Sequence, residues 1–318
     1  MEKKFGKRLK KGVSLAKYTS FRIGGKAEYF LAVKTGEELM EAVGFAKKDG
    51  IDYVLLGGGS NVLVNDAGVS GLVIKLSITS YEVSKKNITA RAGLTLRELS
   101  KLASENSLTG LEWANGVPGT VGGACVMNAG CFGREMKDFL VKVKYFDGKN
   151  IKELAKRQCR FGYRESIFKE NSEWIVLEAE FKLKKGDKKK IIKQVKDYLD
   201  MRNERLPLDY PSAGSVFKKY EIKKGEKLNL YLEKIIKKEH PEFLAGHYIP
   251  AGWLIEELDL CGKKIGGAMV SVKHGNFIVN IGKAKAEEVI MLISMIKQKV
   301  RNHFGIQLAE EVIYLGFD

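Results

Sequence analysis

Apolar residues recur at the spacing of a helix face in four separate stretches of the chain. Thr35 with Glu38 and Thr95 with Glu98 match the capping box, in which a threonine hydroxyl and a glutamate carboxylate bind free N–H groups at a helix start. Pro207 ends the third stretch because its ring cannot continue a helix. The pattern therefore predicts helices over residues 35–50, 95–106, 191–207 and about 284–304.

Short runs rich in branched and aromatic residues lie between these helices and favour β-strands. The runs span residues 53–57, 71–76, 87–93, 141–146, 174–186, 214–220, 268–272, 276–282 and 311–317. Strands and helices do not alternate regularly, so the pattern predicts an α+β fold rather than a Rossmann sheet. At 318 residues the chain can form two domains, and we place the boundary at the end of the third helix, giving domains 1–205 and 206–318.

Two glycine-rich stretches interrupt the pattern. The first, 53-YVLLGGGSNVLVNDAG-68, loses three side chains in a row, and the second, 115-NGVPGTVGGACVMNAGCFG-133, holds six glycines. Glycine lets the backbone approach an anion closely, and successive N–H groups in a turn form a nest for phosphate oxygens. Neither stretch is a Rossmann or Walker loop. Each stretch alone fits a tight turn, but the two together indicate a binding site for a diphosphate dinucleotide such as FAD.

Composition limits the classes of partner. The net charge is +16 and the isoelectric point is about 9.4, which fits either a solvated lysine-rich surface or the attraction of an anionic ligand or nucleic acid. The basic residues are dispersed and form no known basic–aromatic module, which argues against nucleic acid. The four cysteines form no CxxC pair, which argues against a zinc site or a disulfide framework and favours a reducing compartment.

Targeting signals and metal ligands are not expected. The basic N-terminal stretch 1–21 lacks the apolar core of a signal peptide, and the longest apolar run, 289–296, is too short to cross a bilayer. We therefore expect a cytoplasmic protein. His240 and His247 are seven residues apart and are expected at the surface, and we predict no metal site.

Eight short motifs together carry a resemblance to a known family. They are 18-YTSFRIGGKAEYF-30, 56-LGGGSNVLVND-66, 117-VPGTVGGACVMNAG-130, 161-FGYRESIFK-169, 213-AGSVFK-218, 252-GWLIEE-257, 273-KHGNFIVN-280 and 310-EEV-312. Their order over about residues 15 to 317 resembles that of the UDP-N-acetylenolpyruvoylglucosamine reductases, flavoproteins of bacterial cell-wall synthesis. The resemblance implies a two-lobed FAD-binding domain of the vanillyl-alcohol oxidase type over 1–205 and a substrate-binding α+β domain over 206–318.

The resemblance also implies the cofactors and the substrate. FAD would take hydride from NADPH, and the enolpyruvyl group of UDP-N-acetylglucosamine enolpyruvate would accept it to give UDP-N-acetylmuramate. The FAD diphosphate is expected at Gly57, Gly58, Gly59, Ser60, Asn61, Val117, Pro118, Gly119, Thr120, Gly122 and Gly123. The simplest precedent in the family is a monomer, with no nucleic-acid or membrane partner.

Three residues match the family's catalytic positions. By its place in the motif 213-AGSVFK-218, Ser215 matches the family's proton donor. That role is chemically possible, since a serine held rigidly in a dry site can protonate the strongly basic carbon that hydride transfer leaves. Arg164 would stabilise the growing negative charge. Glu311 would orient this assembly, and it is preferred to its neighbour Glu310 because the family's acid directly precedes the valine. The residues expected to contact substrate are Tyr163, Asn128, Arg205, Gly214 and Lys218.

The chain departs from the family pattern after the Ser215 motif. Lys219 and Tyr220 stand where an asparagine and a proline are usual. An extra basic segment, about residues 221–250, follows, and Leu230 with Ile235 and Ile236 predicts a short helix within it.

The family has a longer type, which carries a tyrosine-bearing loop over the substrate, and a shorter type, which lacks it. The stretch between Trp174 and Pro207 has no obvious room for a tyrosine-bearing loop over the substrate, so the chain resembles the family's shorter type. Two alternatives stay open: another FAD-dependent oxidase on the same flavin-binding fold, and a nucleic-acid-binding protein.

Overall fold

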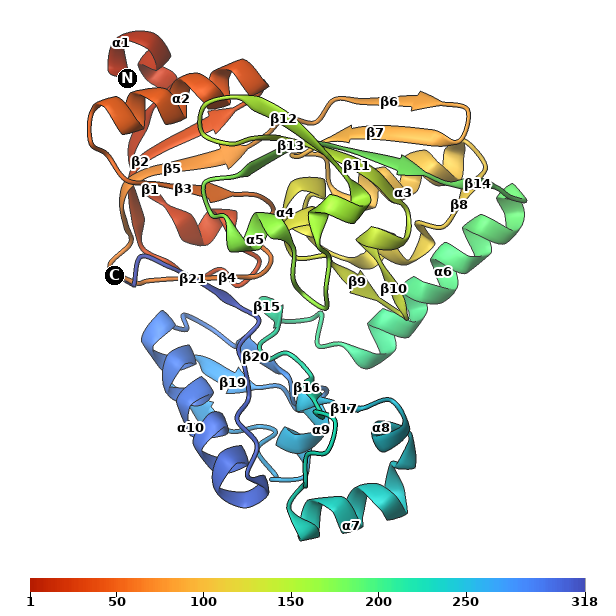
Figure 1. Cartoon of the computed structure of the whole chain (residues 1–318). Coiled ribbons are helices and arrows are strands. Elements are labelled where there is room, and N and C mark those ends of the chain that lie inside the picture. Colours follow the sequence, from red (N-terminus) through yellow and green to blue (C-terminus); the bar gives the residue numbers. More distant parts are fainter. Residues whose placement is uncertain (318) are drawn as a thin grey trace. The chain divides into compact units, whose positions relative to one another are not determined.

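A computed structural model describes residues 1–317 and divides them into two compact units (Figure 1). Unit 1 comprises Met1–Val13, Ala27–Gly59 and Val69–Glu204, and unit 2 comprises Ser14–Lys26, Ser60–Gly68 and the chain from Arg205 onward. The expected domains 1–205 and 206–318 divide the chain beside this last point. Two early segments differ from that expectation: residues 14–26 and 60–68 group with unit 2, because Phe21, Ile23 and Leu63 are buried in its core.

The first layer of unit 1 is a sheet in the strand order β1-β2-β5-β3, with bounds Lys10–Ser14, Lys26–Val33, Val69–Leu76 and Tyr53–Leu56. Strand β5 pairs in parallel with both β2 and β3. Helix α2 (Gly36–Lys48) packs on this sheet (Figure 1). It buries Leu39, Val43 and Ala46, which confirms the apolar stripe of the first predicted helix.

The second layer of unit 1 is an antiparallel sheet in the order β12-β11-β13-β7-β6, with bounds Ile151–Ala155, Leu140–Phe146, Ile175–Lys182, Asn87–Arg91 and Tyr81–Ser84. Its helices are α3 (Leu96–Glu105), α4 (Val121–Val126), α5 (Ile167–Glu170) and α6 (Lys188–Arg205). Short strands form two further pairs, β8 (Leu108–Thr109) with β14 (Lys184–Lys185) and β9 (Gly130–Cys131) with β10 (Arg134–Glu135). The run expected as one strand over 174–186 is thus two strands with different partners, β13 and β14.

The two predicted capping boxes form differently. At α3, Thr95 Oγ1 accepts the Glu98 N–H at 3.1 Å and Glu98 Oε2 accepts the Thr95 N–H at 3.1 Å, so this box is confirmed. At α2, Thr35 Oγ1 accepts the Glu38 N–H at 3.2 Å, but the Glu38 carboxylate binds the Arg8 guanidinium and the N–H of the residue before Thr35. The second half of that prediction is wrong, because a charged donor competes for the carboxylate.

Unit 2 is built on an antiparallel sheet in the order β15-β20-β19-β18, with bounds Ser212–Ser215, Phe277–Asn280, Ala268–Val270 and Lys264–Ile265. Helix α10 (Ala286–Phe304) packs on the sheet and buries the predicted face, Val289, Leu292, Ile296, Val300 and Phe304 (Figure 1). Helix α9 (Ala251–Glu256) shares the same core. Near the end of the chain, β21 (Ile313–Leu315) pairs in parallel with β4 (Val62–Val64).

The extra segment of unit 2 folds as two helices, α7 (Leu230–Glu239) and α8 (Pro241–Ala245). Strands β16 (Tyr220–Glu221) and β17 (Tyr248–Ile249) pair at its base. The short helix predicted here is confirmed, but its inward face differs: Leu232 and Ile236 are buried, whereas Leu230 is 85% exposed. Among residues 1–317, no helix is both long enough and apolar enough to cross a membrane.

Candidate functional site

The two glycine-rich stretches meet within unit 1. A Cβ atom added to Gly58 would lie 2.7 Å from Cα of Gly119, and one added to Gly57 would lie 2.9 Å from Oγ1 of Thr120. Gly59 has a φ of 64° and Gly119 a φ of 131°, conformations that side chains disfavour. The missing side chains therefore have two uses, since they let two loops touch and let each loop turn sharply.

Thr120 carries a buried hydroxyl that no protein group satisfies. Its side chain is 3% exposed, and Oγ1 has no hydrogen-bond partner although it faces Gly57. Leaving a buried hydroxyl unpaired costs about 1–3 kcal/mol, so a partner such as a ligand or a water molecule is expected for this group. A phosphate oxygen is an acceptor that this hydroxyl could satisfy. Val117, Pro118 and Gly119 directly precede Thr120. Val117 and Gly119 are half-buried, and Pro118 is exposed.

The downstream glycines act differently from the expectation of open backbone donors. Residues 121–126 form the short helix α4 instead of a turn. The N–H of Val121 donates to the Leu94 carbonyl at 2.8 Å, and the N–H of Gly122 donates to the Ala92 carbonyl at 2.9 Å. A Cβ on Gly122 would lie 2.8 Å from Cβ of Ala92, so this glycine permits close packing. The exposed Gly123 keeps open space, because a Cβ there would meet its nearest neighbour atom at 3.8 Å.

Lys75 supports the first loop and was not singled out from the sequence. Its ammonium group donates to the Gly57 carbonyl, and burial lowers the pKa of Lys75. A charged donor on a carbonyl is among the stronger hydrogen bonds in a protein interior. The signal was present in the sequence, since Lys75 is the single charged residue in the apolar run 71-GLVIKL-76.

Arg164 projects from a strained turn in unit 1. Its φ is 56°, and the turn is closed by mutual backbone hydrogen bonds between Gly162 and Glu165 at 3.0 and 3.4 Å. The guanidinium carbon lies 5.2 Å from the centre of the Tyr163 ring, and Nη2 donates to the Gly130 carbonyl at 3.2 Å. A non-glycine residue at positive φ is uncommon and often marks a functional position.

Asn128 holds this turn in place. Its Nδ2 donates to the Gly162 carbonyl at 2.8 Å and to Glu135 Oε2 at 3.1 Å, while its Oδ1 accepts the Lys137 N–H at 3.1 Å. The side chain is completely buried. The amide is therefore used by the protein, and this geometry favours support of the arginine turn over the substrate contact expected from the sequence.

A second arginine lies in the same electrostatic environment as Arg164. Burial raises the pKa of Cys131 to about 11, and the guanidinium groups of Arg202 and Arg164 oppose that shift. Arg202 is largely buried, and burial lowers its pKa. Two cations near one neutral thiol form a region that suits a carboxylate or phosphate. Sequence reasoning chose the exposed Arg205 from the stretch 202-RNERLP-207 and missed Arg202.

Ser215 and Glu311 are connected within unit 2 through Val216, which follows Ser215 and accepts a hydrogen bond from Glu311. Ser215 ends β15 opposite Phe277 of β20. Gly214, at a φ of 78° with open space around it, lies at an irregularity in the strand pairing. The next carbonyl, on Val216, accepts the Glu311 N–H at 2.7 Å. Ser215 thus precedes Val216 in the chain and Glu311 binds the Val216 carbonyl, and the glycine supplies the turn that a side chain would strain.

Glu310, the rival of Glu311, is engaged elsewhere. Its Oε1 lies 2.5 Å from Lys297 Nζ, and its Oε2 accepts a hydrogen bond from the Tyr314 hydroxyl. Burial, followed by this carboxylate, raises the pKa of Tyr314 well above its usual range. A carboxylate held by two partners is poorly placed for chemistry, which favours Glu311.

The remaining predicted contacts take varied places in unit 2. Asn61 was expected at the FAD diphosphate. In the structure its Nδ2 donates to the Glu311 carbonyl at 3.0 Å, so it supports the backbone at Glu311. Ser60 is half-buried beside it. The Lys218 N–H donates to the Ala309 carbonyl at 2.8 Å. Lys219 lies over the Tyr248 ring at 4.8 Å, and Tyr220 donates to Glu226, so both departures from the family pattern hold the extra segment.

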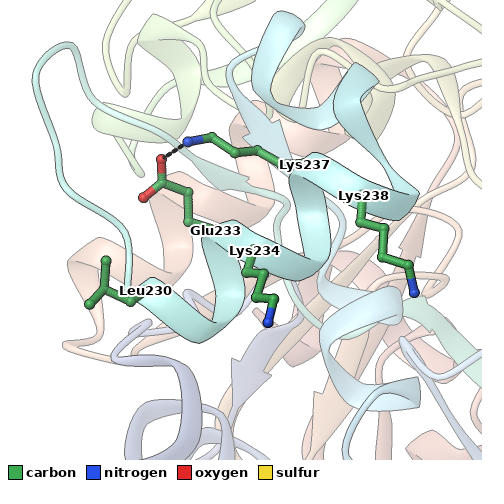
Figure 2. Close-up of a pocket in the computed structure, with 5 residues that line it drawn as sticks. All are labelled: Leu230, Glu233, Lys234, Lys237 and Lys238. Carbon is green, nitrogen blue, oxygen red and sulfur yellow. Dashed lines mark ion pairs between the residues drawn. The ribbon is translucent and has the colours of Figure 1, made fainter.

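A hollow on the extra segment lies apart from these residues. Figure 2 shows it lined by Leu230, Glu233, Lys234, Lys237 and Lys238 of α7. Glu233 and Lys237 form an exposed ion pair at 2.6 Å, one turn apart, which stabilises the helix by only a few tenths of a kcal/mol. The ion pair therefore supports the helix, and the hollow is not assigned to the candidate site.

Comparison with known proteins identifies the family. Residues 27–150 match the family model described as FAD binding domain, and residues 206–315 match the one described as UDP-N-acetylenolpyruvoylglucosamine reductase, C-terminal domain. The reductase of Caldanaerobacter subterraneus is 39% identical over 304 residues, covering 95% of this chain and 92% of its own. That of Clostridioides difficile is 39% identical over 307 residues, covering 96% and 92%. The chain belongs to the UDP-N-acetylenolpyruvoylglucosamine reductase family.

A solved structure agrees with this family. The reductase of Thermus caldophilus matches with a TM-score of 0.75 and 32% identity, covering 97% of this chain and 99% of its own. The predicted fold, the enzyme class of FAD-dependent oxidoreductase and the FAD cofactor are thereby confirmed. The orphaned Thr120 hydroxyl fits an FAD diphosphate, and Gly57 and Gly58 let the two loops that would hold it touch.

Proposed function

We propose that this protein reduces the enolpyruvyl group of UDP-N-acetylglucosamine enolpyruvate with NADPH, giving UDP-N-acetylmuramate for peptidoglycan synthesis in the cytoplasm. Bound FAD supplies the hydride-transfer chemistry between NADPH and the substrate. The names of the relatives support the reaction, and the hydrogen bond from the Glu311 N–H to the carbonyl of Val216, the residue after Ser215, is the observation that carries it. The net charge of +16 favours approach of the anionic nucleotides.

The proposed proton donor is Ser215. Hydride addition to the terminal carbon of the enol ether leaves a carbanion next to the substrate carboxylate, and one proton completes the reduction. Ser215 is half-buried and held at the end of a strand, so its hydroxyl can be delivered to a fixed point. A serine is a weak acid in water, but the carbanion is a strong base and removal of water favours direct transfer.

Arg164 and Glu311 are proposed to manage the charge that accompanies this step. The Arg164 guanidinium is held by Gly130 and over Tyr163, which fixes the orientation of its planar fork for a carboxylate or enolate oxygen. Arg202 adds positive charge to the same region of unit 1. Glu311 is proposed to orient the reacting groups through hydrogen bonds, and Arg205 and Lys218 are proposed to bind the substrate's phosphates.

The cofactor loops are proposed to bind the FAD diphosphate. Thr120 would donate its unused hydroxyl to a phosphate oxygen, and Lys75 would hold the first loop and contribute charge. Gly57, Gly58 and Gly119 would let the two loops approach each other closely where they hold the diphosphate.

Stopped-flow measurement of Ser215→Ala tests the function. We expect flavin reduction by NADPH at the unmutated rate. Flavin reoxidation by UDP-N-acetylglucosamine enolpyruvate without oxygen should be slower by about a hundred- to ten-thousand-fold, the usual contribution of a positioned acid. Ser212→Ala, on the same strand, should reoxidise near the unmutated rate. Rapid reoxidation of the unmutated protein by oxygen, with none by this substrate, would instead favour an oxidase.

A further inference from the structure

Asn276 immediately precedes β20, and its side chain binds the backbone just after Ser215. The Phe217 N–H donates to Asn276 Oδ1 at 2.9 Å, and Asn276 Nδ2 donates to the Phe217 carbonyl at 2.8 Å. The Asn276 carbonyl also accepts the Val216 N–H at 2.9 Å. With the side chain 8% exposed, these hydrogen bonds are protected from water. Three hydrogen bonds from one residue therefore fix the chain at positions 216 and 217.

The hydrogen bonds between Asn276 and Phe217 follow directly after the last strand pair of β15 and β20. The ladder between β15 and β20 ends at the pair of Ser215 with Phe277. Beyond that pair, the Asn276 carboxamide occupies the donor and acceptor of Phe217 as a neighbouring strand would. A buried polar group that is fully satisfied rigidifies its surroundings, whereas a half-satisfied one costs free energy.

The same segment reaches Glu311. Both backbone polar groups of Val216 are hydrogen-bonded: its N–H donates to the Asn276 carbonyl, and its carbonyl accepts the Glu311 N–H at 2.7 Å. Glu311 is held from a second side by Asn61. A displacement of the 216–217 segment would therefore move both the proposed proton donor and the proposed acid.

We propose that Asn276 is a positioning residue that fixes Ser215 relative to Glu311 for the protonation step. The proposal rests on the function proposed above. It assigns a role to an asparagine whose motif, 273-KHGNFIVN-280, was recognised in the sequence without a role for this residue. Displacing a reacting group by about 1 Å can slow a reaction about a hundred-fold, so a support of this kind acts on rate.

The substitution Asn276→Asp tests the role with almost no change in shape. The introduced carboxylate can accept the Phe217 N–H, but it repels the Phe217 carbonyl, to which the amide donated. Once protonated, the carboxyl can donate to that carbonyl again. We therefore expect substrate-driven flavin reoxidation about ten- to a hundred-fold slower at alkaline pH, partly recovering as the pH falls, with flavin reduction by NADPH unchanged.

Asn280→Asp is the matched control. Asn280 is equally buried at 8% and its amide also donates to a carbonyl, that of Phe21 at 3.2 Å. This variant introduces the same buried carboxylate four residues away, away from the 216–217 segment. His274, whose Nδ1 accepts the Asn276 N–H at 3.2 Å, and Glu256, which accepts the Gly275 N–H at 2.8 Å, are nearby titratable groups. Their pH effects are removed by comparing Asn276→Asp with Asn280→Asp across one pH series.

A second readout does not depend on turnover. Hydrogen exchange followed by mass spectrometry should show faster exchange of peptides covering residues 215–218 and 309–312 in Asn276→Asp, but not in Asn280→Asp. Where Asn276→Asp does not accumulate as folded protein, Asn276→Ser replaces it, with the same slowing and no pH-dependent recovery.

Three outcomes decide the matter. Selective slowing of reoxidation with faster exchange at these two peptides supports the positioning role. An unchanged reoxidation rate, or an equal loss of both half-reactions in Asn276 and Asn280 variants, overturns it. Absence of substrate-driven reoxidation in the unmutated protein would instead reject the proposed function, so the two failures are distinguishable.

Discussion

The contact between the two glycine loops makes Gly58 the sharpest test of the cofactor site. In Gly58→Ala, the new Cβ would lie 2.7 Å from Cα, 3.2 Å from C and 3.4 Å from N of Gly119. Ordinary contacts of this type need about 3.5–4.0 Å, and the opposing atoms are backbone that cannot rotate away. The loops must therefore part by roughly 1 Å, an overpacking that costs about 1–3 kcal/mol.

If both loops bind one diphosphate, parting the loops lowers the affinity of the protein for FAD by this free energy. At about 1.4 kcal/mol for each factor of ten, we expect FAD to bind the Gly58→Ala apoprotein roughly 5- to 150-fold more weakly. Fluorescence titration of apoprotein with FAD measures the change. Gly44→Ala is the control, because Gly44 lies in α2 with open space around it, and alanine there should raise stability by about 0.5–1 kcal/mol without changing affinity. Unchanged FAD affinity and melting temperature in Gly58→Ala would refute the reasoning.

Two further predictions concern a hydroxyl and a carboxylate. Thr120→Val removes an unsatisfied buried hydroxyl, so the apoprotein should gain about 1–3 kcal/mol while FAD affinity falls; calorimetry and FAD titration that move in the same direction would contradict this. The Arg8 guanidinium lowers the pKa of Glu38 to about 2, so its contribution to stability is present above about pH 4.5 and is lost as the pH falls from there toward about 2. Glu38→Gln should flatten this part of the acid unfolding curve, and an identical curve would exclude the pair as a source of acid sensitivity.

The sequence predicted the parts of the fold that local patterns determine. Helices α2, α3, α6 and α10 and most of the predicted strands lie where periodicity placed them, but the strand expected over residues 214–220 is divided between β15 and β16, which have different partners. Long-range features were less accessible. The paired strand β4 and the segment around Phe21 belong to the core of unit 2, because residues distant in the chain bury them, and no local pattern reports such a partner.

The candidate site shows the same division between local and distant causes. The glycines were visible because several together are unusual, but their use is partly packing, as Gly122 against Ala92 shows. Lys75 lies in a run expected as a strand and Asn276 in a recognised motif, and neither residue was given a role. Each side chain hydrogen-bonds the backbone of a residue distant in the sequence: Lys75 binds Gly57, and Asn276 binds Phe217. Hydrophobic periodicity does not encode such contacts, so the sequence pattern did not report them.

The choice between two adjacent glutamates shows how the structure can strengthen a sequence argument. Glu310 bridges Phe217 across an antiparallel contact, and its carboxylate is held by Lys297 and Tyr314. Motif matching favoured Glu311 by its place before the valine, and packing favours it because the first glutamate's charge is already compensated. Both arguments favour Glu311, whose N–H donates to the carbonyl of Val216, the residue that follows Ser215.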